Sequence, residues 1–288
     1  MLRHSEQVRA LAPVDLTAII HLLSTSEYTY QRFTLDELEH LLKSYPAVGL
    51  THKNSLRSFL LSQTVNPPSA WIGGFGVSWS ESRAAQRFLN LLLDKLTDLL
   101  TEQGVKALYY SGNDRENDWL HAPLLERGFT LFRQLYGYDK FDYAIPTAGN
   151  QEVSVRSAEL SDLPTLLTLE ERCFEQLWRY DPASLSDIIQ THPYFVVAEL
   201  QGKPVGYQFN ALDGEYGYLV RIGVDPTYNG LGIGARLMAE AMKFFQDSHA
   251  TRIMLNTQEE NTHAHRLYEW FGFVRIPQIG FVLRLEIS

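Results

Sequence analysis

Cysteine is almost absent from this chain, which excludes most disulfide chemistry from the outset. The single cysteine among 288 residues, Cys173, can form no internal disulfide and no cysteine-rich metal site, and we expect it to be a small buried residue. No apolar run approaches the roughly 18 residues that a membrane-spanning helix needs. The first residues, 1–6, lack the apolar core of a secretory signal. These absences predict a cytoplasmic protein without a membrane anchor.

Positively charged residues are also fewer than negatively charged ones. Lys and Arg number 25 against 34 Asp and Glu, which gives a net charge of −9. Such a chain is a poor candidate for binding nucleic acid or an anionic membrane, and a better one for a cationic or amine-bearing partner. The imbalance lies mainly in residues 151–288, which carry −7 against −2 for residues 1–150. The length favours two globular domains.

The two halves of the chain repeat one another. Segments 8–16 (VRALAPVDL) and 155–163 (VRSAELSDL) share Val, Arg, Asp and Leu at identical spacing, 147 residues apart. Two unrelated α/β domains are the alternative, but the preserved order of further matches favours a duplication. At an offset of 147 or 144 these matches pair Pro46 with Pro193, Gly76-Val77 with Gly223-Val224, Glu116-Asn117 with Glu260-Asn261, His121 with His265 and Gly128-Phe129 with Gly272-Phe273.

A small, polar segment at 146–150 marks the predicted boundary between a domain over residues 1–147 and one over 151–288. In the second domain, period-2 and helical hydrophobic patterns follow one another. Their order is a strand, two helices, a three-strand meander, and then helix, strand, helix and strand. The pattern predicts an α/β (α+β) fold with a mixed, mostly antiparallel sheet flanked by helices, and the first domain follows the same plan.

The sharpest local signal is a glycine-rich loop between a predicted strand and an amphipathic helix over 233–245. Gly230, Gly232 and Gly234 stand at alternate positions there. Glycines let a ligand approach the backbone closely, and the helix N-terminus adds its positive dipole end. A dinucleotide-binding turn would have its glycines nearer the strand, and a Walker loop would continue with Lys-Ser or Lys-Thr. A phosphate or pyrophosphate cradle is favoured, with a ligand-free turn as the alternative.

Taken together, several strings resemble the GCN5-related N-acetyltransferase (GNAT) superfamily over about residues 152–288. They are 221–226 (RIGVDP), 230–234 (GLGIG) and, further on, Asn261, Ala264, Leu267-Tyr268 and Gly272-Phe273. The second domain is most similar to the branch that acetylates the N-termini of ribosomal proteins, and the tandem layout resembles that of mycothiol synthases. The resemblance implies direct transfer of an acetyl group from acetyl-CoA to a primary amine in a ternary complex, with no metal.

The resemblance also implies roles for individual residues. The edge of the strand before the loop and Asn261 would bind the pantetheine arm of acetyl-CoA, and the loop would cradle the pyrophosphate. Tyr268 would act as the general acid that protonates the leaving thiolate. The cofactor-binding residues implied in this way are Ile222, Gly223, Val224, Gly230, Leu231, Gly232, Ile233, Gly234, Ala235 and Asn261.

The general base is the least defined part of the predicted site. The N-terminal acetyltransferase branch has a Glu where this chain has Asn256. Glu215, placed first, and Tyr218 and Glu259 are the candidates to replace it. Asn229 stands where the family commonly has Gln or Arg, which predicts weakened rather than abolished cofactor binding.

The first domain lacks the features that point to catalysis. The segment 83–88 (RAAQRF) replaces the glycine run, and Leu124 stands at the position that matches Tyr268. We therefore expect a GNAT-like domain that binds no acetyl-CoA. His263 and His265 are expected to be exposed helix residues rather than metal ligands, because positions two apart on a helix point to different faces.

The identity of the partner is less constrained. The expected acceptor is a small-molecule amine or a peptide N-terminus, and the expected state is a monomer or homodimer. A non-catalytic protein that binds or senses acyl-CoA is the alternative function.

Overall fold

The computed structural model describes residues 6–287, and the chain forms two compact units. Residues 1–5, part of the start that lacks a secretory signal, lie outside the described range. Among the described residues, unit 1 contains 6–112, 116–132 and 282–287, and unit 2 contains 113–115 and 133–281. Within residues 6–287, no helix is long and apolar enough to cross a bilayer.

The two units exchange strands. Strand β7 (Thr130–Lys140) starts in unit 1 and continues in unit 2, and β13 (Val274–Glu286) runs from unit 2 into unit 1. Residues 133–147, which the sequence assigns to the first domain, therefore lie in unit 2, and 282–287 lie in unit 1. Alternation along a strand reports which side chains are buried but not which sheet the strand joins, so the pattern gives no sign of this exchange.

Unit 2 has the order of elements that the sequence predicts. Its strands lie in the order β8-β9-β10-β11-β12-β7-β13. The β10–β11 hairpin is antiparallel, and β11 and β12 are parallel, so the predicted mixed, mostly antiparallel sheet is confirmed. The elements are β8 (Val153–Ser157), α5 (Leu163–Cys173), α6 (Pro182–Thr191), β9 (Tyr194–Leu200), β10 (Lys203–Asp213), β11 (Tyr216–Val224), α7 (Ile233–Asp247), β12 (Arg252–Gln258), α8 (Thr262–Trp270) and β13.

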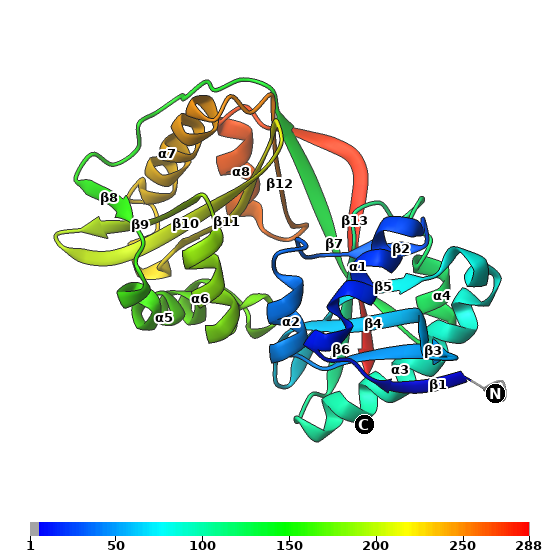
Figure 1. The fold of residues 1–288 in the computed structure, drawn as a ribbon. Helices are drawn as coiled ribbons and strands as arrows, with labels where there is room; N and C mark the ends of the chain where they lie inside the picture. Colours follow the sequence, from blue (N-terminus) through cyan, green and yellow to red (C-terminus); the bar gives the residue numbers. More distant parts are fainter. Residues whose placement is uncertain (1–5, 288) are drawn as a thin grey trace. The chain divides into compact units, whose positions relative to one another are not determined.

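Helices cover both faces of the unit 2 sheet (Figure 1). Helices α7 and α8 pack on one face, where Met238, Met242 and Phe245 are fully buried. Helices α5 and α6 pack on the other, around Leu166 and Phe209. Burial of both faces explains why the central strands read as nearly continuous apolar runs.

Unit 1 repeats this plan with strands in the order β1-β3-β4-β5-β6-β13. One further short strand, β2, pairs with β5. The elements are β1 (Glu6–Ala10), α1 (Leu16–Thr25), β2 (Thr29–Gln31), α2 (Leu38–Ser44), β3 (Ala47–His52), β4 (Ser55–Asn66), β5 (Ser69–Val77), α3 (Ala85–Glu102), β6 (Ala107–Gly112) and α4 (His121–Glu126).

A repeated ion pair explains the repeated sequence at the start of each unit. Both guanidinium Nη groups of Arg9 donate to the Asp15 carboxylate, at 2.9 and 2.5 Å. Arg156 and Asp162 make the same two bonds in unit 2, each at 2.8 Å. The Asp of each pair also caps a short 3-10 turn by accepting a backbone N–H, from Ala12 or Glu159. Arg and Asp recur at one spacing because both units contain this paired turn.

Candidate functional site

The centre of unit 2 holds two parallel strands that separate. Strands β11 and β12 pair only over Tyr216–Tyr218 and Arg252–Met254. Beyond that point β11 continues to Val224 and is paired with β10 alone among the described residues. The backbone edge of β11 that faces away from β10 is therefore open to an extended ligand, as the edge of a sheet is to an added strand. Three predicted cofactor residues, Ile222, Gly223 and Val224, lie on this stretch.

An irregularity in β11 marks the start of the open stretch. Leu219 pairs with Asn210 and Arg221 pairs with Phe209, so Val220 is an extra residue in a β-bulge. A bulge leaves backbone groups outside the regular ladder and turns them toward a neighbour. Unit 1 has the same bulge at Gly73, 147 residues earlier, between the pairs Leu61–Gly74 and Ser62–Ile72.

The glycine loop follows the open edge directly. Gly230 and Gly232 have φ angles of 79° and 73°, in the left-handed region that favours glycine. A Cβ at Gly230 would meet nothing within 4 Å, so the loop is open there. Gly232 is the N-cap of α7, whose first-turn N–H groups have no acceptor within the helix. Ile233 and Ala235 are buried, so these two residues can contribute only backbone groups to a cradle.

Gly149 and Asn150, which the sequence predicts to be part of a linker, support this loop. The backbone N–H of Asn150 donates to the Gly232 carbonyl at 3.2 Å, and its side chain donates to the Leu231 carbonyl at 2.9 Å. A Cβ on Gly149 would lie 2.2 Å from the backbone nitrogen of Arg236, so only glycine fits. The small, polar composition that indicates a linker here reflects close packing against the start of α7.

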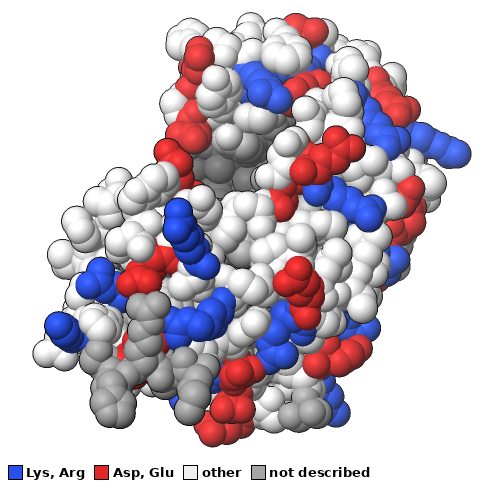
Figure 2. Space-filling model, turned by 90° about the vertical axis from the view of Figure 1, so that its right-hand side faces the viewer, with Lys and Arg blue, Asp and Glu red and all other residues white. Residues whose placement is uncertain are grey.

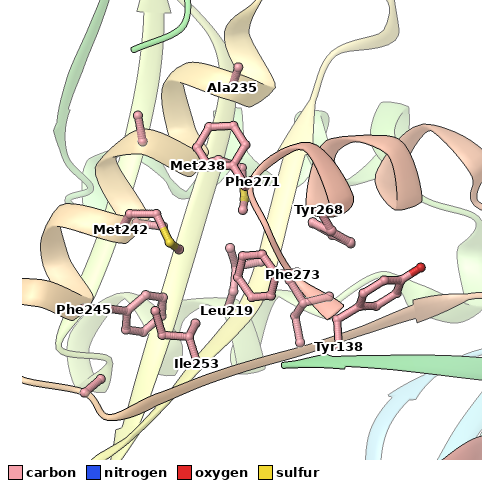
Figure 3. Close-up of a cluster of buried hydrophobic side chains, with 14 residues drawn as sticks. Tyr138, Leu219, Ala235, Met238, Met242, Phe245, Ile253, Tyr268, Phe271 and Phe273 are labelled. Carbon is pink, nitrogen blue, oxygen red and sulfur yellow. The ribbon is translucent and has the colours of Figure 1, made fainter. Parts of the chain in front are cut away.

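Tyr268 lies on α8 and faces the core beside the loop. It is 5% exposed and belongs to an apolar cluster with Ala235, Leu219 and Tyr138, which Figure 3 shows packed under α7 and α8. Burial raises the pKa of its phenol well above the ordinary value. The hydroxyl therefore holds its proton at neutral pH, as a proton donor requires.

Asn261 has a structural role at the start of α8. It is the N-cap of α8, where its side-chain oxygen accepts the N–H of Ala264 at 3.2 Å. Its side-chain nitrogen donates to Thr257 Oγ1 at 3.1 Å. The cap fixes the start of the helix that carries Tyr268.

The three candidate bases lie in different places. Glu215 is exposed in the turn before β11, about 30 Å of extended strand from Val224. Tyr218 is half-buried where β11 and β12 separate, and burial raises its pKa. Glu259 follows β12, and its side chain accepts a hydrogen bond from the hydroxyl of Tyr136.

The sequence analysis did not predict a buried ion pair between β11 and helix α5. Arg221 donates to both carboxylate oxygens of Glu170, at 3.1 and 2.8 Å, and Glu170 is 1% exposed. The guanidinium also lies 3.8 Å from the ring centre of Phe174 and 4.5 Å from that of Tyr180. Desolvation raises the pKa of Glu170, and Arg221 opposes that shift. The pair ties α5 to the open stretch of β11.

The charges on the face drawn in Figure 2 are mixed. Lys and Arg side chains and Asp and Glu side chains are both spread over this view, and Asp and Glu follow one another along its upper left side.

The equivalent strand edge in unit 1 is filled by the chain itself. Strands β5 and β6 also pair over only three residues, Ser69–Trp71 with Ala107–Tyr109. In unit 1, however, β2 pairs with the next part of β5, Gly74–Gly76. These positions match 221–223 of the open β11 edge at the 147-residue offset.

Unit 2 therefore has parallel central strands that separate beside a glycine-rich helix start. The family model described as "Acetyltransferase (GNAT) family" matches residues 163–273. The N-alpha-acetyltransferase RimI of Mycobacterium tuberculosis is 30% identical over 135 residues, which cover 45% of this chain and 84% of that protein. The chain belongs to the GNAT acetyltransferase family.

Other relatives match a smaller part of their length. The mycothiol acetyltransferase of Thermobispora bispora is 33% identical over 117 residues, or 38% of this chain. N-alpha-acetyltransferase 30 of Saccharomyces cerevisiae is 40% identical over 63 residues, or 22% of this chain. The match spans 36% of the length of each of these two relatives.

Solved structures match the whole chain in fold. A tandem GNAT protein from the clavulanic acid biosynthesis pathway has a TM-score of 0.72 at 13% identity, with 98% of this chain and 99% of that chain covered. A GCN5-related N-acetyltransferase from Sphaerobacter thermophilus has a TM-score of 0.66 at 16% identity, with 100% and 98% covered. The tandem GNAT fold expected from the repeats is confirmed.

Proposed function

We propose that this protein is an acetyl-CoA-dependent N-acetyltransferase whose single cofactor site lies in unit 2. The observation that carries the proposal is the contrast between the two units. The edge of β11 at 221–223 is open and leads into Gly230 and Gly232, whereas β2 fills the matching edge of β5. Acetyl-CoA fits the open edge, because an extended pantetheine arm can pair with a strand and a pyrophosphate can meet the start of α7.

The residues of unit 2 supply what direct acyl transfer needs. The amine nitrogen attacks the thioester carbon, and backbone N–H groups at the Val220 bulge stabilise the negative charge on its oxygen. As the carbon–sulfur bond breaks, Tyr268 gives its proton to the departing thiolate. The proton lost by the amine passes to the Glu259 carboxylate or to water. No covalent intermediate on the protein is required.

The acceptor is proposed only as a class. Two of the relatives are named N-alpha-acetyltransferases, and a third is named mycothiol acetyltransferase. We propose a small-molecule amine or a peptide N-terminus for this chain. The cytoplasmic location and the monomeric or homodimeric state stay predictions from the sequence.

Calorimetric titration of acetyl-CoA tests the cofactor site. Gly230→Glu places a carboxylate in the proposed cradle, and Gly202→Glu is the matched control. Gly202 has a φ of 74° in the β9–β10 turn and, like Gly230, has open space around it. We expect one site per chain, lost in G230E and kept in G202E. Two sites would contradict the proposal for unit 1, and unchanged binding in G230E would contradict the cradle.

Release of free CoA then separates an enzyme from a binding protein. Wild type and G230E are incubated with acetyl-CoA and, in turn, spermidine, an amino acid amide and a short peptide with a free N-terminus. We expect amine-dependent CoA release by wild type alone. Saturable binding without release for any amine would favour the acyl-CoA binding or sensing alternative.

A further inference from the structure

Two buried amides lie on β10, next to the open stretch of β11. Gln208 and Asn210 are both 0% exposed, and the side-chain nitrogen of Gln208 donates to the side-chain oxygen of Asn210 at 3.0 Å. They face α7, because Gln208 pairs across the sheet with Val196, which packs against Ile233 and Leu237 of that helix. The pair therefore lies in an apolar layer between the sheet and α7, where polar side chains are costly to bury.

The hydrogen bond satisfies only part of the two amides. Among the described residues, no group lies within hydrogen-bond reach of Gln208 Oε1 or Asn210 Nδ2. Burying a polar atom without a protein partner lowers the stability of the fold, whereas an apolar side chain of the same shape does not carry this penalty. The packing of the core alone therefore gives no reason for two amides at these positions.

The amide pair spans the irregularity in β11. Asn210 pairs with Leu219, the residue before the extra Val220, and Gln208 pairs with Ile222, two positions after it. The hydrogen bond therefore ties the two positions of β10 that pair with the two ends of the bulge. Because a shift of register by one residue turns a side chain to the opposite face of the sheet, it would take Ile222 away from α7.

Unit 1 has the same bulge without such a pair. In β4, Ser62 pairs with the residue before the bulge at Gly73, and Leu60 pairs with the residue two positions after it. These are the places that Asn210 and Gln208 take in unit 2. Leu60 and Ser62 are both buried. The bulge itself therefore forms beside a leucine and a serine.

The two bulged strands differ in what lies along their other edge. In unit 1, β2 pairs with β5 at 74–76, directly after the bulge. In unit 2, the matching stretch 221–223 of β11 pairs with β10 alone among the described residues. A strand that is paired along one edge is held by one ladder, so its register and its end are less firmly fixed. The Arg221–Glu170 pair holds this stretch from the α5 face, and the amide pair lies on the α7 face.

We infer that Gln208 and Asn210 are positioning residues that keep the open edge of β11 in the register that acetyl-CoA binds. This rests on the proposed cofactor site. Unit 1 has a second strand that holds its bulge, whereas unit 2 has a hydrogen bond along the single partner strand. The edge is then formed before the cofactor arrives, so binding does not have to order the strand.

The test uses the residues of unit 1 in unit 2. Gln208→Leu/Asn210→Ser places there the two side chains that stand beside the bulge of β5. Because unit 1 folds with them, we expect the double variant to keep the wild-type thermal midpoint within about 3 °C. Q208L alone should be less stable than the double variant, because it leaves the Asn210 amide without its partner. If the midpoint of the double variant is lower, Gln208→Met/Asn210→Leu, which is closer to wild type in volume, takes its place.

Hydrogen exchange of the backbone amides over 217–226 reports on the edge and needs no acceptor. Without acetyl-CoA, we expect exchange in this segment to be about tenfold faster in the double variant, with β9 and β12 unchanged. With saturating acetyl-CoA the variant and wild type should agree, because the pantetheine arm then fills the edge. Calorimetry should give an acetyl-CoA Kd about tenfold weaker than that of wild type, because the binding-competent state is less populated.

Ser62→Ala is the matched control in unit 1. It removes a buried hydroxyl that donates to the carbonyl of Pro46 at 2.6 Å, next to a bulge that β2 already holds. We expect no change in exchange over 217–226 and no change in the affinity for acetyl-CoA. A loss of stability in general is in this way separated from a loss of order at the open edge.

The outcomes separate this inference from the proposed function. Wild-type exchange over 217–226 in the ligand-free double variant, or a wild-type Kd, would overturn the inference. Faster exchange throughout unit 2 would also overturn it, because the effect would then be a general loss of stability. If wild type itself binds no acetyl-CoA, the proposed function is wrong, and the ligand-free exchange still decides whether the amide pair holds the edge.

Discussion

At the scale of single residues, the same side chain can serve the fold and the chemistry. Asn261 caps α8 with its oxygen and holds Thr257 with its nitrogen, and this places Tyr268 two turns further along the helix. Tyr268 in turn is a core residue by burial and the proposed acid by position. Glu170 and Arg221 are similar, since their buried pair joins α5 to the open stretch of β11.

Replacing Tyr268 by Phe tests the acid directly. The ring is kept, so the cluster stays filled, and only the hydroxyl is lost. We expect kcat to fall by about a hundredfold, because the thiolate must then leave without a proton donor. The dissociation constant for acetyl-CoA, measured by calorimetry, should change by less than about twofold. An equal loss of affinity and rate would mean that Tyr268 binds the cofactor rather than donating a proton.

At the scale of elements, each unit contains a short 3-10 turn that is held by an Arg–Asp ion pair. The bidentate bonds of Arg156 lower the pKa of Asp162, and those of Arg9 do the same for Asp15. A carboxylate with a lowered pKa stabilises the folded state above its ordinary pKa of 3.8. That contribution disappears as the pH falls through the lowered value.

Asp162→Asn tests this contribution, with Asp15→Asn as the matched variant in unit 1. Each substitution removes the charge and keeps the shape. We expect the free energy of unfolding at neutral pH to fall by about 1 kcal/mol, a small value because Arg156 is 41% exposed. The difference from wild type, followed by urea unfolding, should shrink as the solution is acidified. A difference that is constant down to the acid range would exclude the lowered carboxylate pKa as its source.

At the scale of the whole molecule, the two units share strands although their sites differ. Residues 274–281 of β13 belong to unit 2 and 282–286 to unit 1, without a break in the strand. Melting of one unit therefore removes part of a strand from the other. The duplication gave two similar folds, of which one carries the proposed site and the other fills its matching strand edge with β2.

Shared strands predict one cooperative unfolding transition. Leu92→Ala in α3 of unit 1 and Met238→Ala in α7 of unit 2 each remove a fully buried side chain. We expect each to destabilise the protein by about 2 to 5 kcal/mol and to shift the single transition as a whole. Differential scanning calorimetry checks this by comparing the calorimetric and van't Hoff enthalpies, which agree for a two-state transition. Two peaks, of which each variant moves only one, would show that the units melt independently.

The sequence by itself determined the order of elements, the duplication and the glycine loop. These follow from local causes: hydrophobic period, φ angles that only glycine adopts readily, and an Arg–Asp pair six residues apart in both units. Tertiary structure alone decided which sheet each strand joins, what covers each strand edge and which distant side chains meet. Gly149 and Asn150 read as a linker yet support the loop, and His265 reads as an exposed helix residue yet bonds Tyr138, 127 positions away. Such contacts depend on the path of the whole chain, which no local pattern encodes.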